Sequence, residues 1–216
     1  MSKVVVVGAT GYTGTNICRE LVERGHEVIA VARDTSKLML DEVTPIEFDL
    51  EDTAKLAEVA RGADAVILAV PHRAVREGGP VLAEIITDVA AATAATGTRL
   101  GVVGGAGSLF VAEGAPRLFD TPEFPAEFRT EAMLAFDTLE AMQTLPANTH
   151  WFYLSPAAGY GSFNPGERQG KYRTSKDVLV SDENGMSFIS GVDFAKAIVD
   201  ELENPQHENE RFTVGY

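Results

Sequence analysis

The first fourteen residues restrict the fold of this 216-residue chain more than any other segment. Four consecutive valines, Val4 to Val7, run directly into a loop in which Gly8, Gly11 and Gly14 recur at every third position. An all-apolar strand is typical of a parallel sheet that is covered on both faces. After the loop, apolar side chains recur at helical spacing, at Ile17, Cys18, Leu21 and Val22. The pattern therefore predicts a buried strand, a tight glycine turn and an amphipathic helix.

The rest of the chain alternates between short β-branched runs and helical patterns, which is typical of βαβ units. The expected strands cover residues 4–7, 27–33, 45–49, 65–70, 100–103, 149–154 and 211–214. Further helices are expected over residues 52–61, from Gly79-Pro80 onward, over 129–143 and over 192–203. Residues 177–180 and 186–189 resemble a hairpin joined by Asn-Gly. We predict an α/β fold: one Rossmann-type domain over residues 1–216, doubly wound, with a mainly parallel sheet and helices on both faces.

Composition narrows the possible partners. The chain has 32 acidic and 18 basic residues and a net charge of −14, whereas nucleic-acid binding needs concentrated Lys and Arg. No apolar stretch approaches the ~20 residues of a membrane helix, and Met1 leads into the first strand without a signal peptide. We therefore expect a cytoplasmic protein that binds neither nucleic acid nor membranes. The four histidines are scattered and Cys18 is the single cysteine, so no metal site is expected.

The glycine loop has the spacing that a dinucleotide requires. The first glycine permits the tight turn, the second lets the backbone approach a pyrophosphate, and the third lets the helix pack closely on the strand. The helix then offers free N–H groups and a positive dipole end to the phosphates. We therefore predict a nicotinamide dinucleotide site whose contacts are Gly8, Thr10, Gly11, Tyr12, Thr13, Gly14, Arg33, Asp49, Leu50, Ala69, Val70 and Pro71.

The end of the second strand indicates which dinucleotide is bound. An NAD site usually places an acidic residue there to accept the ribose hydroxyls, but this strand ends in Arg33. A guanidinium matches a 2′-phosphate, so we expect NADP(H) in preference to NAD(H). A shift of one residue would instead give Asp34 the NAD role. Asp49, at the end of the third strand, is expected either to cap the adenine ring or to cap the next helix.

Several motifs make the chain similar to a known family. The glycine loop, Arg33 and residues 62–67 resemble the atypical branch of the short-chain dehydrogenase superfamily. Residues 103–109, 155–158, 165–173 and 211–216 resemble the bacterial NADH-flavin reductase family, which is related to biliverdin reductase B and to NmrA-like proteins. The resemblance covers nearly the whole chain. It implies an NAD(P)H-dependent reductase with a flavin, FMN or FAD, as a candidate substrate, and places Ser108 near the nicotinamide as the candidate catalytic residue.

The Tyr and Lys that act as the acid pair of the wider superfamily do not occur at the usual position in this sequence. Tyr172 and Lys176 match its Tyr-x-x-x-Lys spacing but follow the sixth strand, whereas the pair functions from the helix between strands five and six. That helix, residues 129–143, has neither Tyr nor Lys. Flavin reduction can leave protonation to solvent, so we expect hydride transfer to a flavin or similar planar acceptor. The alternative is a non-catalytic, NADP-binding, redox-sensing regulator of the NmrA type.

The remaining expectations concern the acceptor side of the cleft. The irregular loops over about residues 156–190 are expected to form it, with Tyr160 and Phe163 available either to stack on a planar substrate or to pack the loop. His72 follows the fourth strand and is expected to be an ordinary loop histidine. We expect a small-molecule acceptor and a monomer or homodimer.

Overall fold

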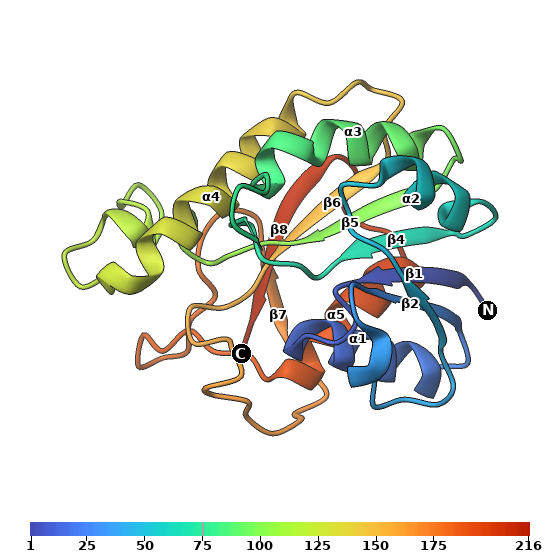
Figure 1. Cartoon of the computed structure of the whole chain (residues 1–216). Helices are drawn as coiled ribbons and strands as arrows, with labels where there is room; N and C mark the ends of the chain where they lie inside the picture. The colour runs from blue at the N-terminus through green and yellow to red at the C-terminus, as the bar shows by residue number, and fades with distance from the viewer. Residues whose placement is uncertain (75) are drawn as a thin grey trace.

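Eight strands form one mostly parallel sheet in the computed structural model, which describes residues 1–74 and 76–216. The strand order is β3-β2-β1-β4-β5-β6-β8-β7, and only β7 is antiparallel to its neighbour (Figure 1). The strands are β1 (Lys3–Val7), β2 (Glu27–Ala32), β3 (Thr44–Glu47), β4 (Ala65–Leu68), β5 (Arg99–Val103), β6 (Trp151–Ser155), β7 (Arg173–Ser175) and β8 (Glu210–Gly215). The predicted α/β, Rossmann-type architecture is confirmed.

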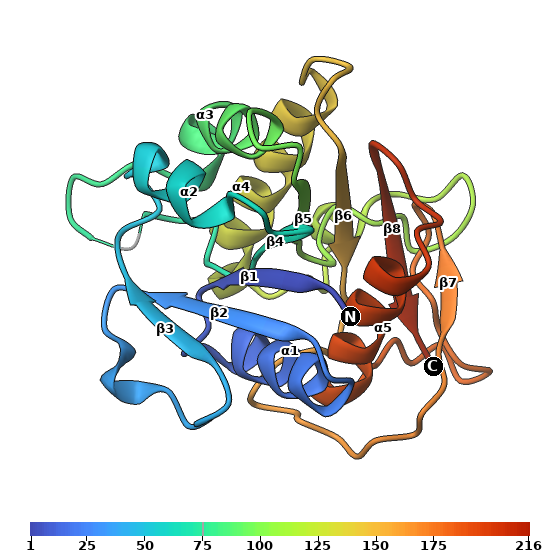
Figure 2. The same cartoon turned by 90° about the vertical axis from the view of Figure 1, so that its right-hand side faces the viewer.

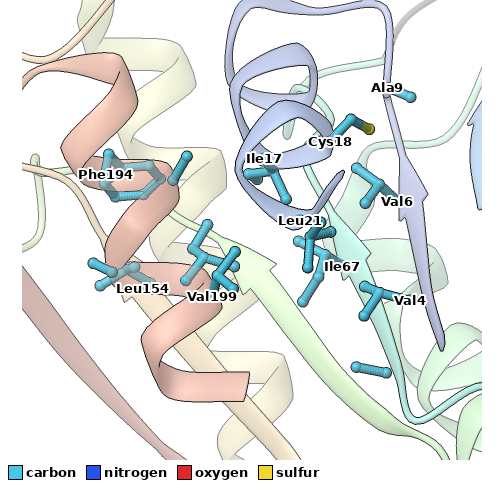
Figure 3. Close-up of a cluster of buried hydrophobic side chains, with 14 of the residues drawn as sticks. Val4, Val6, Ala9, Ile17, Cys18, Leu21, Ile67, Leu154, Phe194 and Val199 are labelled. Carbon is cyan, nitrogen blue, oxygen red and sulfur yellow. The ribbon is translucent and has the colours of Figure 1, made fainter. Parts of the chain in front are cut away.

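Helices cover both faces of this sheet. The α-helices are α1 (Tyr12–Glu23), α2 (Thr53–Ala60), α3 (Leu82–Ala94), α4 (Ala126–Gln143) and α5 (Gly191–Glu203). In Figures 1 and 2, α1 and α5 lie together on one face, and α2, α3 and α4 lie on the other. Side chains alternate accordingly along β1, where Val4 and Val6 face α1 and α5 while Val5 and Val7 face the other layer. Figure 3 shows the first of these two cores.

Helix starts follow local capping chemistry. The carboxylate of Asp52 accepts a hydrogen bond from the N–H of Lys55 and caps α2, and the Ser190 hydroxyl caps α5 through the N–H of Asp193. The third helix was expected to start at Gly79-Pro80, but α3 begins at Leu82, after Pro80. Conversely, α4 begins at Ala126, three residues before the expected start.

The expected hairpin over residues 177–189 is wrong. Residues 177–180 run beside Phe110, whose N–H donates to the carbonyl of Asp177 at 2.8 Å and whose carbonyl accepts from Leu179 at 2.9 Å. The Asn-Gly sequence does form a turn, closed by the N–H of Asp182 on the carbonyl of Met186, but no strands extend from it. The edge strand at that end of the sheet is instead β7, which pairs with β8.

Over residues 1–74 and 76–216, no helix is long and apolar enough to cross a bilayer. Within the same described residues, no group of three or more His, Cys, Asp or Glu side chains is arranged to hold a metal ion.

Candidate functional site

The glycine loop between β1 and α1 owes its shape to two close backbone approaches. Gly8 has a φ of +86°, and a Cβ there would lie 2.3 Å from the carbonyl oxygen of Ala69. At Gly14 a Cβ would lie 2.2 Å from the carbonyl oxygen of Gly8. Neither position can carry a side chain without displacing backbone, so both glycines are needed for β1, α1 and the end of β4 to meet.

The amino end of α1 provides a phosphate-binding surface. The helix starts after Gly11, which has extended backbone (φ −77°, ψ 166°), and no side chain caps it. The N–H groups of a first helical turn lack partners within the helix, and the dipole is positive there. Gly11, Tyr12 and Thr13 all line the cleft. These features fit the pyrophosphate of a dinucleotide.

One half of the cleft lies over the carboxyl ends of β1, β2 and β4 and has a volume of about 220 Å³. We call it the dinucleotide half. Its walls include most of the predicted cofactor residues: Gly8, Thr10, Gly11, Arg33, Asp49, Leu50, Ala69, Val70 and Pro71. Tyr12 and Thr13 line the adjoining cavity instead, and Gly14 lines neither because it packs against Gly8.

The structure separates the roles of Arg33 and Asp34. Arg33 lines the dinucleotide half, whereas Asp34 caps the 3₁₀ turn Thr35–Lys37. The carboxylate of Asp34 accepts hydrogen bonds from the hydroxyl of Ser36 at 2.6 Å and from its N–H at 3.0 Å. These bonds lower the pKa of Asp34. Of the two residues, Arg33 and not Asp34 therefore lines the dinucleotide half.

The second half of the cleft has a volume of about 430 Å³ and is bounded by β4, β5, β6 and α4. We call it the acceptor half. It shares Gly11, Ala69, Val70 and Pro71 with the dinucleotide half, so the two halves form one cleft. This cleft lies where the strand order reverses between β1 and β4, the usual ligand position in open parallel sheets. From the loops expected on this side, Pro156, Ala157, Ala158 and Tyr160 contribute to the wall.

Glu131 is a cleft residue that the sequence pattern did not single out. It lies on the same face of α4 as Phe128 and Ala135, and all three line the acceptor half. Its carboxylate accepts a hydrogen bond from the N–H of His72 at 2.7 Å and pairs with Arg73 at 3.1 Å. The three- and four-residue spacing along α4 is the signal that could have revealed it. Glu131 thus ties α4 to the loop after β4.

His72 borders the acceptor half but is structurally engaged on both ring nitrogens. Nε2 lies 3.0 Å from the carbonyl oxygen of Val103, and Nδ1 lies 2.9 Å from the hydroxyl of Thr138. Because a carbonyl only accepts, Nε2 carries the proton. Burial lowers the pKa of His72, so the ring is neutral at neutral pH. It links the loop after β4 to β5 and α4, which agrees with the expectation of an ordinary histidine.

Tyr160 connects the acceptor side to the start of α1. Its hydroxyl lies 2.7 Å from the hydroxyl of Thr13, and its ring packs 4.6 Å from that of Phe194 between centroids. Burial raises the pKa of Tyr160, so the phenol stays protonated. The ring of Tyr12 lies 5.8 Å away. Tyr160 therefore fixes the loop after β6 against the helix end that would hold the phosphates.

Ser108 does not lie in the cleft. Its side chain is buried, and its hydroxyl accepts a hydrogen bond from Arg211 at 2.8 Å. Gly105 and Gly107 of the same loop do line the acceptor half. The buried guanidinium of Arg211, which also pairs with Asp177, requires acceptors and takes the serine hydroxyl as one. The predicted position of Ser108 beside the nicotinamide is therefore corrected.

Tyr172 and Lys176 are also remote from the cleft. The hydroxyl of Tyr172 donates to Asp200 of α5 at 2.6 Å, and Lys176 pairs with Glu210 of β8 at 2.8 Å. Neither residue lines either half of the cleft. This placement agrees with the expectation that the Tyr-x-x-x-Lys sequence is not the superfamily's acid pair.

Comparison with known proteins agrees with this geometry. A family described as NAD(P)H-binding matches residues 8–205. The uncharacterized Bacillus subtilis protein YwnB is 42% identical over 220 residues, which span 98% of this chain and 97% of YwnB. A proposed epimerase from Bacteroides thetaiotaomicron has a TM-score of 0.87 and 35% identity, covering 100% of this chain and 97% of that one. A proposed NADH-flavin reductase from Streptococcus pneumoniae has a TM-score of 0.83 and 34% identity, covering 100% and 99%.

These matches extend over the glycine loop, both halves of the cleft and the sheet that carries them. They also agree with the resemblance found in the sequence motifs. The chain belongs to the NAD(P)H-binding family.

Proposed function

We propose that this chain is an NADPH-dependent reductase that delivers hydride to a flavin or a similarly flat acceptor. The observation that carries the proposal is the two-part cleft, in which the acceptor half opens directly onto the dinucleotide half along Gly11 and Ala69 to Pro71. At about 430 Å³ the acceptor half is within the usual range for small-molecule sites. The name of the Streptococcus pneumoniae relative supports the same class of acceptor.

The residues of the cleft fit a positioning role. NADPH, when bound, supplies the hydride. The open end of α1 suits the pyrophosphate, and Arg33, which lines the dinucleotide half, would pair with a 2′-phosphate. Residues 69–71 lie between the two halves and would set the contact between donor and acceptor. Holding two flat rings together supplies much of the rate of such a reaction.

The hydroxyl and imidazole groups of the acceptor half are committed to protein contacts. Tyr160 bonds to Thr13, the Tyr12 hydroxyl donates to the carbonyl of Pro165 at 3.4 Å, and His72 is neutral and held on both nitrogens. Ketone reduction develops charge on oxygen and benefits from a poised donor. A flavin can receive its proton from water. The described lining residues therefore favour a flavin-like acceptor over a ketone.

The test is NADPH oxidation by the purified protein with riboflavin, FMN or FAD as acceptor. We expect turnover with at least one flavin, and a loss of turnover in Gly11→Val, which serves as the control for cofactor binding. Calorimetry with NADP⁺ is run in parallel.

If NADP⁺ binds and no flavin is reduced, the reductase proposal fails. Tyr172 and Lys176 do not line the cleft, so a dinucleotide-binding regulator without turnover would then be the better description.

A further inference from the structure

Two large aromatic side chains are exposed next to the acceptor half. Phe128 is 50% exposed and Phe163 is 70% exposed. Their rings are nearly parallel, with an interplanar angle of 19° and centroids 6.4 Å apart. Burying an aromatic ring away from water is strongly favourable. An exposed pair of such rings therefore indicates a binding surface for another molecule.

The two rings come from separate parts of the chain. Phe128 lies in the first turn of α4 and lines the acceptor half. Phe163 lies in a tight turn closed by the N–H of Asn164 on the carbonyl of Gly161. A Cβ on Gly161 would lie 2.3 Å from the Phe163 ring, so the ring lies directly on that glycine. The turn therefore holds the Phe163 ring, which stacks on that of Phe128.

Exposed aromatic rings are a surface on which a further flat ring can stack. Interacting aromatic pairs have centroids about 4.5–7 Å apart, and this pair is near the wide end of that range. Because Phe128 is also part of the cavity wall, a flat molecule that extends outward from the acceptor half reaches this ring first.

We propose that Phe128 and Phe163 are the outer part of the acceptor site and select flat, multi-ring acceptors by stacking on the rings furthest from the dinucleotide half. The proposal rests on the proposed reductase function and adds its specificity residues. A second copy of the chain is the rival occupant of the two rings. Continuity of Phe128 with the cavity wall favours the acceptor.

The first test compares acceptors of different size. Phe128→Ala and Phe163→Ala should each raise KM for riboflavin about tenfold, the effect of losing one stacked aromatic partner. KM for benzoquinone, a single small ring, should change by less than about twofold, because it fits within the acceptor half. The Kd for NADP⁺ should not change. Met133→Ala is the matched control, since Met133 is an exposed apolar residue of α4 that does not line the cavity.

The second test measures binding without turnover. Stacking should quench the fluorescence of riboflavin added to the NADP⁺-loaded protein, and both Phe variants should lose most of that quenching. If riboflavin is quenched but never reduced, the stacking site stands and the reductase function fails. If riboflavin is reduced with the same KM in the Phe variants as in Met133→Ala, the stacking site fails and the reductase stands. If the unmodified protein gives no quenching, the stacking site is also overturned, and a dimer that the Phe variants dissociate would identify the second copy as the occupant.

Discussion

Gly11 differs from the other two loop glycines in what a side chain would meet. A Cβ at Gly14 would lie 2.2 Å from the carbonyl oxygen of Gly8, whereas a Cβ at Gly11 would lie 3.3 Å from the same atom. Gly14→Ala should therefore destabilise the fold by about 1–3 kcal/mol, as overpacking does. Gly11→Val should leave the fold intact and abolish NADP⁺ binding, because its methyl groups occupy the approach to the pyrophosphate. Thermal unfolding and calorimetry on both variants separate the two effects, and near-native affinity in Gly11→Val would contradict the assignment.

Arg33 is expected to set the preference between the two dinucleotides. It lines the dinucleotide half while Asp34 is occupied in capping a turn. A hydrogen bond to a charged group contributes about 1.5–3 kcal/mol, so Arg33→Ala should weaken NADPH binding about 10- to 150-fold. NADH binding should change little. The measurement is Kd for both cofactors, with Arg61→Ala as the control because Arg61 is exposed and outside the cleft. Equal losses for NADPH and NADH would remove the specificity role from Arg33.

At the scale of single elements, the sequence predicted what is local. The unit from β1 to α1 could be predicted because its signals are close together in the sequence. A valine run forms the strand, a glycine forms the turn at positive φ, and an apolar face marks the helix. The hairpin prediction for residues 177–189 was wrong because the partner of this segment is distant in the sequence. Its turn is held by the Asp182 carboxylate, which accepts from the N–H groups of Asn184 and Met186, and its extended part pairs with Phe110, far away in sequence.

The candidate site could be predicted to a similar extent. The dinucleotide half follows from the glycine loop and strand ends, and nine of its lining residues were predicted from the sequence. The acceptor half depends on how α4 and the loop after β6 come together, and Glu131 gave no signal until its helix was placed. The prediction for Ser108 was wrong because its partner, the buried guanidinium of Arg211, is 103 residues away in the sequence. No local pattern indicates that this guanidinium needs the serine hydroxyl as an acceptor. The strand Arg173–Ser175 is polar and short, so it carried no strand pattern.

The contact between Ser108 and Arg211 joins the loop after β5 to β8, and its loss should affect stability rather than chemistry. Removing an acceptor from a charged donor costs about 1.5–3 kcal/mol, and that loss is expected for Ser108→Ala in urea unfolding. NADPH–flavin turnover should stay within about threefold of the unmodified protein, since general acid catalysis would account for a far larger factor. A thousandfold loss of turnover with unchanged stability would instead indicate a catalytic role for Ser108.

At the scale of the whole molecule, the titrating groups predict a loss of stability toward acid. Burial lowers the pKa of His72 below its ordinary value of 6.5. The unfolded chain therefore takes up a proton that the folded protein refuses, and stability should fall as the pH drops below about 6.5. Burial opposes ionisation of Asp200, yet hydrogen bonds from Lys196, Tyr172 and Arg24 lower its pKa overall. That contribution is present above the unfolded pKa and is lost as the pH falls through the folded one.

We therefore expect the free energy of unfolding to be flat near neutrality, to decline below about pH 6.5 and to decline more steeply below about pH 4. Urea unfolding across this range checks the shape. His72→Gln should flatten the upper part of the decline and leave the lower part. A decline near pH 6 that persists unchanged in this variant would assign it to another group.

The order of the last three strands, β6-β8-β7, also constrains how the chain can fold as it is synthesised. The ribosome releases β7 before β8, yet β8 is the sheet neighbour to which β7 pairs. Until residues 210–215 emerge, the nascent chain keeps β6 as an open edge and carries β7 unpaired. Open strand edges are sites of aggregation, so this interval is the vulnerable stage of biosynthesis. Loss of β8 alone would remove two strands from the sheet, because β7 has no place in it until β8 arrives.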